Sequence, residues 1–508
     1  MYVARWIGRA VAAAAALWLA SPASAAWRRA ESSNFIVYSQ SSEAALRQDV
    51  ALLEDYNWFL RLLTGIEDPA PANKLRIYMV RGHSALEIVR PGVGENVGGF
   101  YTATGAGIAA FVDDKAESGG REGNQILFHE IAHHFMLQYR PTAYPGWYVE
   151  GFAEYVSTAT FQGDRIDYGL PSTVRASWLA NARWLPLEQV LFDRPTQSGE
   201  ATALYYAQSW LLVHYFLRDP ARKAKLVQYL NATREGEAPK AAFARVFGME
   251  PKALQREVEA YARKGMTYSR LKRKSATAVP AMTIVQLPPS ADDLMIAQGA
   301  LEVGVRDEHG PALLARIRSA AARHDDLYSR RILAKAEAMY GDSAAADRLL
   351  DPLLAAAPTD PELLYLKGLR HVRSARRGGA NEEKERKLAQ SFFGRAHKAD
   401  PNHFQTLMRY PESLQGEQRF LSDNTINVML LAHELAPQVT EITVKAAQLL
   451  LLRERYDEAA ALIAPLASSP HEPRLAAQAQ AMLAQARARK RLPVVVIPPL
   501  RLPDPGKQ

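Results

Sequence analysis

Cysteine is absent from this 508-residue chain. Its absence excludes disulfide bonds, thiolate nucleophiles and cysteine-ligated metals, so any bound metal must be held by histidine, aspartate or glutamate. A strong charge of one sign is also missing, because 62 Lys and Arg stand against 54 Asp and Glu. The net charge of +8 is mild for this length, and we expect no nucleic-acid partner. Stability must therefore come from a large core or from stacked repeats.

Long uncharged apolar runs are missing after the N-terminus, so we expect no transmembrane span in the mature protein. Residues 1–25 have the pattern of a secretory signal peptide: Arg5 and Arg9 precede a short apolar run, and an A-x-A cleavage signal ends at Ala25. An uncleaved membrane anchor is the alternative, but the run is short for one. We therefore expect an exported protein, periplasmic or secreted, in a bacterium.

The region 26–270 mixes strand-like and helix-like patterns. The expected elements are strands at 35–38 and 74–80, a helix that begins at Ser41 or Ser42, and a hairpin over residues 98–112. Helical patterns dominate after the hairpin. This texture predicts an α+β domain.

The region 291–490 is helical in pattern and contains an internal repeat. In each copy an Ala- or Leu-rich helix end is followed by a proline and a new helix; the prolines are Pro358, Pro401, Pro437 and Pro470. Their spacing approaches the roughly 34-residue period of tetratricopeptide repeats, although a generic helical bundle is the alternative. Residues 271–290 are expected to be a basic, proline-containing linker, and 491–508 a proline-rich tail.

The stretch FHEIAHHF carries two histidines four positions apart. Because an α-helix has 3.6 residues per turn, His129 and His133 should project from the same face, about 6 Å apart along the axis. Two imidazoles in this arrangement can bind one zinc ion, and Glu130 can reach a water at that metal. The alternative is an ordinary core helix, because Phe128 and Phe135 flank the motif.

A second helix should follow a break at residues 141–146, which contain two prolines and a glycine. A helix that starts near Trp147 can return beside the first and present Glu150 to the two histidines. Catalytic zinc takes three protein ligands and leaves one position open for water. Glu154 lies one turn beyond Glu150, where it can accept the second ring N–H of a ligating histidine. A solvated helix face is the alternative for both glutamates.

Together, HEIAHH and WYVEGFAEY resemble the gluzincin metallopeptidases, and more narrowly the peptidase MA-like group of exported bacterial proteins. The resemblance implies a thermolysin-like catalytic domain, with a small mixed sheet and active-site helices, followed by an all-α repeat domain. It also implies that His129, His133 and Glu150 bind one Zn²⁺ and that Glu130 is the general base. Gluzincins bind the substrate backbone along an edge strand, which the predicted hairpin would supply.

Related enzymes stabilise the oxyanion with a tyrosine or histidine, and the segment LYYAQSWLLVHYF is the best place to look for one. Tyr206 is the candidate, and Tyr205 and His214 are the alternatives. An aromatic core stripe explains the same pattern without catalysis.

We therefore expect an exported zinc metallopeptidase that hydrolyses a peptide or protein and docks a protein partner through its repeats. Two alternatives stay open. One is a catalytically inactive, peptidase-like scaffold that acts through the repeats, and the other is a zinc amidase that acts on a non-peptide amide.

Overall fold

The computed structural model describes residues 26–491 except 96, 114–121, 143, 172, 194–198, 274–279 and 468–472. The expected signal peptide at 1–25, the tail after Arg491 and Pro470 lie outside these residues. The chain is mixed α+β and mostly helical. In the part of the chain that the structure describes, no helix combines the length and apolar character needed to span a bilayer.

Within the described residues, six strands form the main sheet in the order β4-β5-β3-β2-β1-β9. The strands are β1 (Arg28–Glu31), β2 (Phe35–Ser39), β3 (Leu75–Val80), β4 (Gly99–Ala103), β5 (Ile108–Asp113) and β9 (Thr283–Gln286). Strands β2, β3 and β5 are parallel, whereas β4 pairs antiparallel with β5 and β1 pairs antiparallel with β2 and β9. The expected strands and hairpin are present as β2, β3 and β4–β5.

The two faces of the sheet pack against different helices because successive side chains along a strand point to opposite faces. Val37 and Ile77 face the core beneath α2 (Glu43–Thr64) and α4 (Glu122–Tyr139). Tyr78 faces the opposite core, beneath α3 (His83–Val89) and α12 (Ser290–Val303). Helix α2 begins where the sequence predicted, because Ser42 accepts a capping hydrogen bond from the Ala45 N–H.

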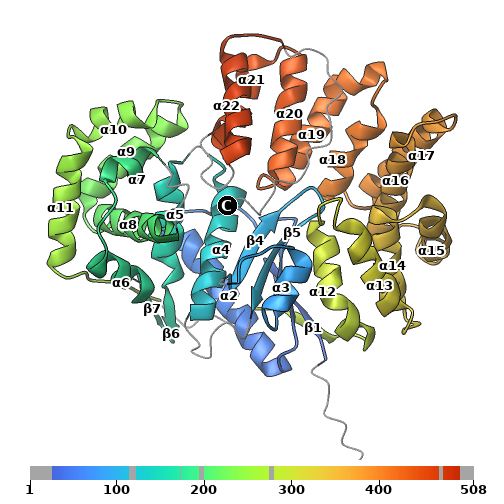
Figure 1. Cartoon of the computed structure of the whole chain (residues 1–508), viewed down its shortest axis with the longest axis horizontal. Helices are drawn as coiled ribbons and strands as arrows, with labels where there is room; N and C mark the ends of the chain where they lie inside the picture. The colour runs from blue at the N-terminus through green and yellow to red at the C-terminus, as the bar shows by residue number, and fades with distance from the viewer. Residues whose placement is uncertain are drawn as a thin grey trace, which may run out of the picture.

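A second group of helices lies beside the sheet, on the left of Figure 1. It contains α5 (Gly146–Ser157), α6 (Thr173–Asn181), α7 (Leu187–Phe192), α8 (Gly199–Leu217), α9 (Pro220–Arg234), α10 (Pro239–Phe247) and α11 (Pro251–Arg263). In the described residues a small sheet of β6 (Thr160–Gln162), β7 (Arg165–Tyr168) and β8 (Ser269–Lys272) joins this group. Helices α5 and α8 lie so close together that a Cβ added to Gly151 would be 2.3 Å from the Ser209 carbonyl oxygen.

Two described parts of the expected linker at 271–290 lie in sheets. Strand β8 pairs with β7, and β9 pairs with β1 at the edge of the main sheet. Helix α12, at the start of the expected repeat domain, fills the core on one face of the main sheet. The sequence did not show this because Thr283–Gln286 is a short β-branched run between prolines, and only the pairing makes it a strand.

The C-terminal region is a series of helices in which consecutive members pack against each other. They are α13 (Gly310–Ala321), α14 (Leu327–Tyr340), α15 (Ser343–Ala356), α16 (Pro361–Arg376), α17 (Glu382–Ala399), α18 (Phe404–Ser413), the short 3₁₀ helix η1 (Gln418–Leu421), α19 (Asp423–Leu435), α20 (Thr440–Leu452), α21 (Tyr456–Ala467) and α22 (Pro473–Arg487). Pro358, Pro401 and Pro437 lie in turns between successive helices. The region is therefore repeat-like, and it curves from α12 to α20–α22 at the top of Figure 1.

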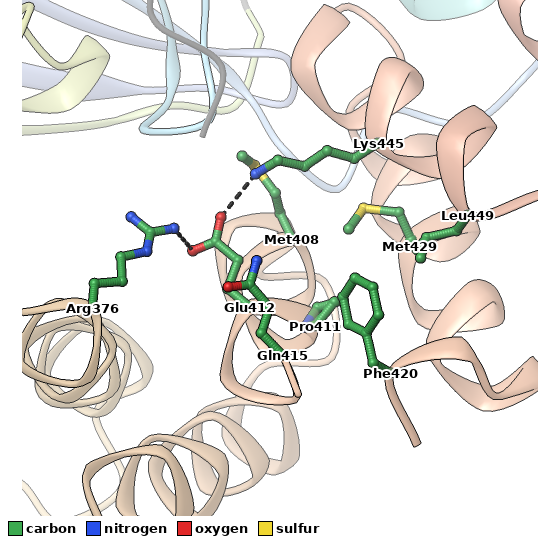
Figure 2. Close-up of a pocket in the computed structure, with 9 residues that line it drawn as sticks. All are labelled: Arg376, Met408, Pro411, Glu412, Gln415, Phe420, Met429, Lys445 and Leu449. Atoms are coloured by element: carbon green, nitrogen blue, oxygen red, sulfur yellow. Dashed lines mark hydrogen bonds and ion pairs between the residues drawn. The ribbon is translucent and has the colours of Figure 1, made fainter. Parts of the chain in front are cut away.

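A buried carboxylate stabilises the middle of this helical region. Glu412 on α18 pairs with Arg376 at 2.6 Å, Lys445 at 2.8 Å and Arg409 at 2.9 Å. Figure 2 shows the first two of these pairs at one wall of a small pocket. Burial alone would raise the pKa of Glu412, but the three cations outweigh it and lower the pKa to about 2.

Candidate metal centre

Helix α4 is held in place by its apolar face. Phe128, Ile131, Ala132 and Phe135 are buried in the core shared with α2. The Tyr56 ring of α2 stacks on Phe128 at 4.0 Å, and its hydroxyl donates to the Phe128 carbonyl oxygen at 2.9 Å. A helix fixed in this way presents His129 and His133 in one direction, and their Nε2 atoms lie 2.9 Å apart.

Glu150 of α5 lies against the two histidines. Its carboxylate is 1% exposed, and Oε2 lies 3.5 Å from His129 Nε2 and 3.3 Å from His133 Nε2. The three side chains place one ligand atom each within 4.8 Å of the others. Metal–ligand bonds of roughly 2.0–2.2 Å put the ligands of a tetrahedral site about 3.3–3.6 Å apart. The three donors therefore fit one metal ion with small adjustments, and two imidazoles with one carboxylate suit several first-row divalent metals.

Glu154 lies behind the first histidine, one turn along α5 from Glu150. Its Oε1 is 3.4 Å from His129 Nδ1. Arg175 of α6 binds the same carboxylate through two hydrogen bonds, from Nε at 3.0 Å and from Nη2 at 2.7 Å. The structure therefore places Glu154 where it can orient the His129 ring, and Arg175 holds Glu154 in turn.

Three carboxylates act on the His129 ring, those of Glu150, Glu154 and Glu130. Burial alone would lower the pKa of His129, but the hydrogen bond that its ring donates to Glu150 and the charges of Glu154 and Glu130 outweigh burial and raise the pKa to about 9. The neighbouring carboxylates therefore favour a positive charge on the His129 ring.

Tyr206 of α8 also lies at the site, with its ring centroid 6.1 Å from that of His129. Its hydroxyl donates to Glu150 Oε1 at 3.3 Å, and its ring lies 5.1 Å from the Arg175 guanidinium. The two alternatives lie elsewhere. Tyr205 is buried in the hydrophobic core. His214 bonds the Thr267 carbonyl oxygen at 2.8 Å, and burial lowers its pKa to about 4.

Glu130 lies beside the edge strand of the sheet. The Tyr101 N–H of β4 donates to Glu130 Oε2 at 3.2 Å. The Tyr101 hydroxyl lies 3.2 Å from Nδ1 of His134, whose pKa burial lowers to about 4. Glu130, the predicted base, therefore contacts β4 of the predicted hairpin.

Two residues at the site were missed by the sequence analysis, namely Arg175 and Tyr101. Arg175 lies in a short helix whose residues show no motif. Tyr101 was within the predicted hairpin, but a strand pattern does not tell which residue contacts a distant helix. The one sequence feature that points to this contact is His134, the histidine directly after the predicted ligand His133, because the Tyr101 hydroxyl lies against its ring.

Comparisons with known proteins give limited information. No protein-family model matches the chain. No curated protein matches it. Among solved structures, the chain is similar to a thermophilic tetratricopeptide-repeat protein of Thermus thermophilus, with 18% identity over 38% of this chain and 99% of that chain and a TM-score of 0.33. The repeat-like description of the C-terminal region rests on the helix packing above, and the gluzincin assignment stays a prediction.

Proposed function

We propose that the protein is a zinc-dependent peptidase. The observation that supports this most strongly is the convergence of His129, His133 and Glu150, from two different helices, within the distance that one ion spans. The next residue after the first ligand is Glu130, which suits a general base.

We assign each residue of the site a separate role in the reaction. His129, His133 and Glu150 hold the metal, which when bound polarises a carbonyl and lowers the pKa of a water to about 7. Glu130 accepts the proton of the attacking water and passes it to the leaving amine. Tyr206 donates its hydroxyl hydrogen bond to the oxyanion that develops on the substrate.

The substrate proposed is an extended peptide. Strand β4 forms one edge of the main sheet in the described part of the chain, and the Tyr101 N–H on it faces Glu130. An exposed edge binds an extended chain through main-chain hydrogen bonds. A peptide added there would pair with main-chain groups of β4 other than the Tyr101 N–H, which bonds Glu130, and would lie beside the proposed metal ligands.

The helical region and the N-terminal segment complete the proposal. Stacked helices offer a broad surface, which we propose docks a protein partner. The signal-peptide pattern of residues 1–25 supports export to a bacterial periplasm or to the medium.

Metal content is the first test. Purified wild-type protein is expected to contain about one zinc per chain by mass spectrometry of its metals. Glu150→Ala is expected to lose it, because two histidines remain and one ligand is gone. A wild type that binds no zinc from a zinc-containing buffer contradicts the proposal.

Activity is the second test, with an unfolded protein as the substrate. Glu130→Gln is expected to bind zinc and to lose cleavage. Tyr206→Phe is expected to lower kcat by roughly 10²-fold or more, whereas Tyr205→Phe, a matched control one position away, should not. Full cleavage by Glu130→Gln contradicts the mechanism. Zinc binding with cleavage of cell-wall amides and not of protein supports the non-peptide amidase instead.

A further inference from the structure

The turn of the β4–β5 hairpin is held by the C-terminal helices. Thr104 Oγ1 donates to the Val303 carbonyl oxygen at the end of α12, at 2.6 Å. Gln405 Nε2 of α18 donates to the Ala106 carbonyl oxygen at 3.1 Å. Gly105 fits because it has no side chain, since a Cβ there would lie 2.4 Å from Met408 Cε. The hairpin therefore contacts the C-terminal helices at its turn.

One residue of the hairpin contacts α4 at two points. The Tyr101 N–H donates to Glu130 Oε2, and the Tyr101 hydroxyl lies 3.2 Å from His134 Nδ1. The Tyr101 and His134 rings also meet edge-on, with their centroids 5.5 Å apart. Glu130 and His134 are four positions apart, so they lie on the same face of α4, one turn from each other.

The next residue of that face contacts the C-terminal helices directly. Gln138 lies four positions beyond His134, and its Oε1 accepts a hydrogen bond from Gln438 Nε2 at 2.6 Å. Gln438 lies in the turn before α20 and is 2% exposed. Its Nε2 is also 3.5 Å from His134 Nδ1. The face formed by Glu130, His134 and Gln138 thus connects the site to the turn before α20.

We propose that Tyr101, His134 and Gln438 are positioning residues through which the C-terminal helices hold the Glu130 carboxylate in its working orientation. This inference rests on the proposed function of Glu130 as the base. A glutamate side chain has several rotamers, and the Tyr101 N–H fixes one of its oxygens. The C-terminal helices are then part of the support of the site as well as a docking surface.

The test uses substitutions along this chain of contacts in the full-length protein. Tyr101→Phe and His134→Leu each remove the hydroxyl–imidazole contact, and Gln438→Leu removes the amide. His134→Asn is the conservative variant, because its amide offers a hydrogen-bonding group near the position of Nδ1. The measurements are hydrogen exchange of the Tyr101 amide, zinc affinity, and kcat and KM on an unfolded protein substrate.

We expect the Tyr101 amide to exchange roughly tenfold faster in the Phe and Leu variants, because β4 opens from α4 more often. We also expect kcat to fall roughly tenfold with KM and zinc affinity unchanged, because the base is displaced and the ligands are not. His134→Asn should restore both values to within about twofold of the wild type.

The control variant is Phe393→Leu. Phe393 of α17 is buried in a core cluster formed by α14 to α17, which includes no residue of the hairpin, α4 or α20, so the substitution loosens the helical region without touching these contacts. It should lower the stability of the protein and leave kcat unchanged.

Two results overturn the inference. In the first, both Tyr101→Phe and His134→Leu leave kcat and the exchange rate of the backbone amide at position 101 within twofold of the wild type. The second is a His134→Leu protein whose zinc affinity falls as much as its kcat, because the substitution then acts on the neighbouring ligand. If the exchange rates respond as expected but the wild type cleaves no peptide, the contacts stand and the proposed function fails.

Discussion

Replacing Glu154 tests whether this carboxylate orients a proposed metal ligand, His129. Glu154 accepts two hydrogen bonds from Arg175 and lies 3.4 Å from His129 Nδ1. Glu154→Gln keeps the size but puts an amide NH₂ against one of these donors. Loss of such a partner typically costs 10–100-fold in metal affinity, or about 1.4–2.7 kcal/mol.

The affinity change should appear as a change in stability. At free zinc about 100 times the dissociation constant, the wild type gains about 2.7 kcal/mol of unfolding free energy. A variant with tenfold weaker binding gains about 1.4 kcal/mol at the same zinc concentration. The assay is urea unfolding of the wild type and the Glu154→Gln variant, each with and without zinc.

Glu337→Gln is the matched control. Glu337 is a buried glutamate on α14 that also binds an arginine through both oxygens, Arg318 at 2.6 and 2.9 Å. It is expected to lower stability equally with and without zinc. Equal zinc-induced stabilisation in Glu154→Gln and the wild type would refute the orienting role of Glu154.

Three further predictions concern stability and catalysis. Because the folded-state pKa of Glu412 is lowered from 4.5 to about 2, its ion pairs contribute fully above pH 4.5 and are lost as the pH falls toward 2; urea unfolding should show a loss of about 3 kcal/mol over this window that Glu412→Gln lacks. Gly151→Ala should destabilise the protein by about 1–3 kcal/mol, because the new methyl meets the Ser209 carbonyl; a thermal midpoint equal to that of the wild type contradicts this packing. Arg175→Ala should weaken zinc binding by roughly tenfold, measured by competition with a chelator, and unchanged affinity would show that Glu154 needs no support.

The sequence predicts the central part of the site because helix geometry is local. The i, i+4 spacing puts His129 and His133 on one face of α4, and the same spacing puts Glu150 and Glu154 on one face of α5. A break in the chain between α4 and α5 is enough to let Glu150 and Glu154 lie against the two histidines. The distances between them agree with that simple expectation.

The remaining contacts depend on tertiary structure, and the sequence does not show them. Arg175 approaches Glu154 from α6, which has no apolar stripe or motif to mark its orientation. The 271–290 segment has linker-like composition, but its described residues include the end of β8 and the whole of β9. Local pattern decides which elements form, whereas pairing partners far along the chain decide where they go.

The burial pattern of α4 differs from that of a helix that packs through its apolar residues alone. Leu137, an apolar residue, is 38% exposed, whereas His133 and His134 are 7% and 6% exposed. Folding stability alone favours the reverse arrangement, because buried polar groups lose hydration and must find partners. Here the partners come from three directions: Glu150 for one histidine, Tyr101 for the other, and Gln438 from the turn before α20. A helix that buries two histidines and exposes a leucine is positioned by its polar contacts as well as by its apolar ones.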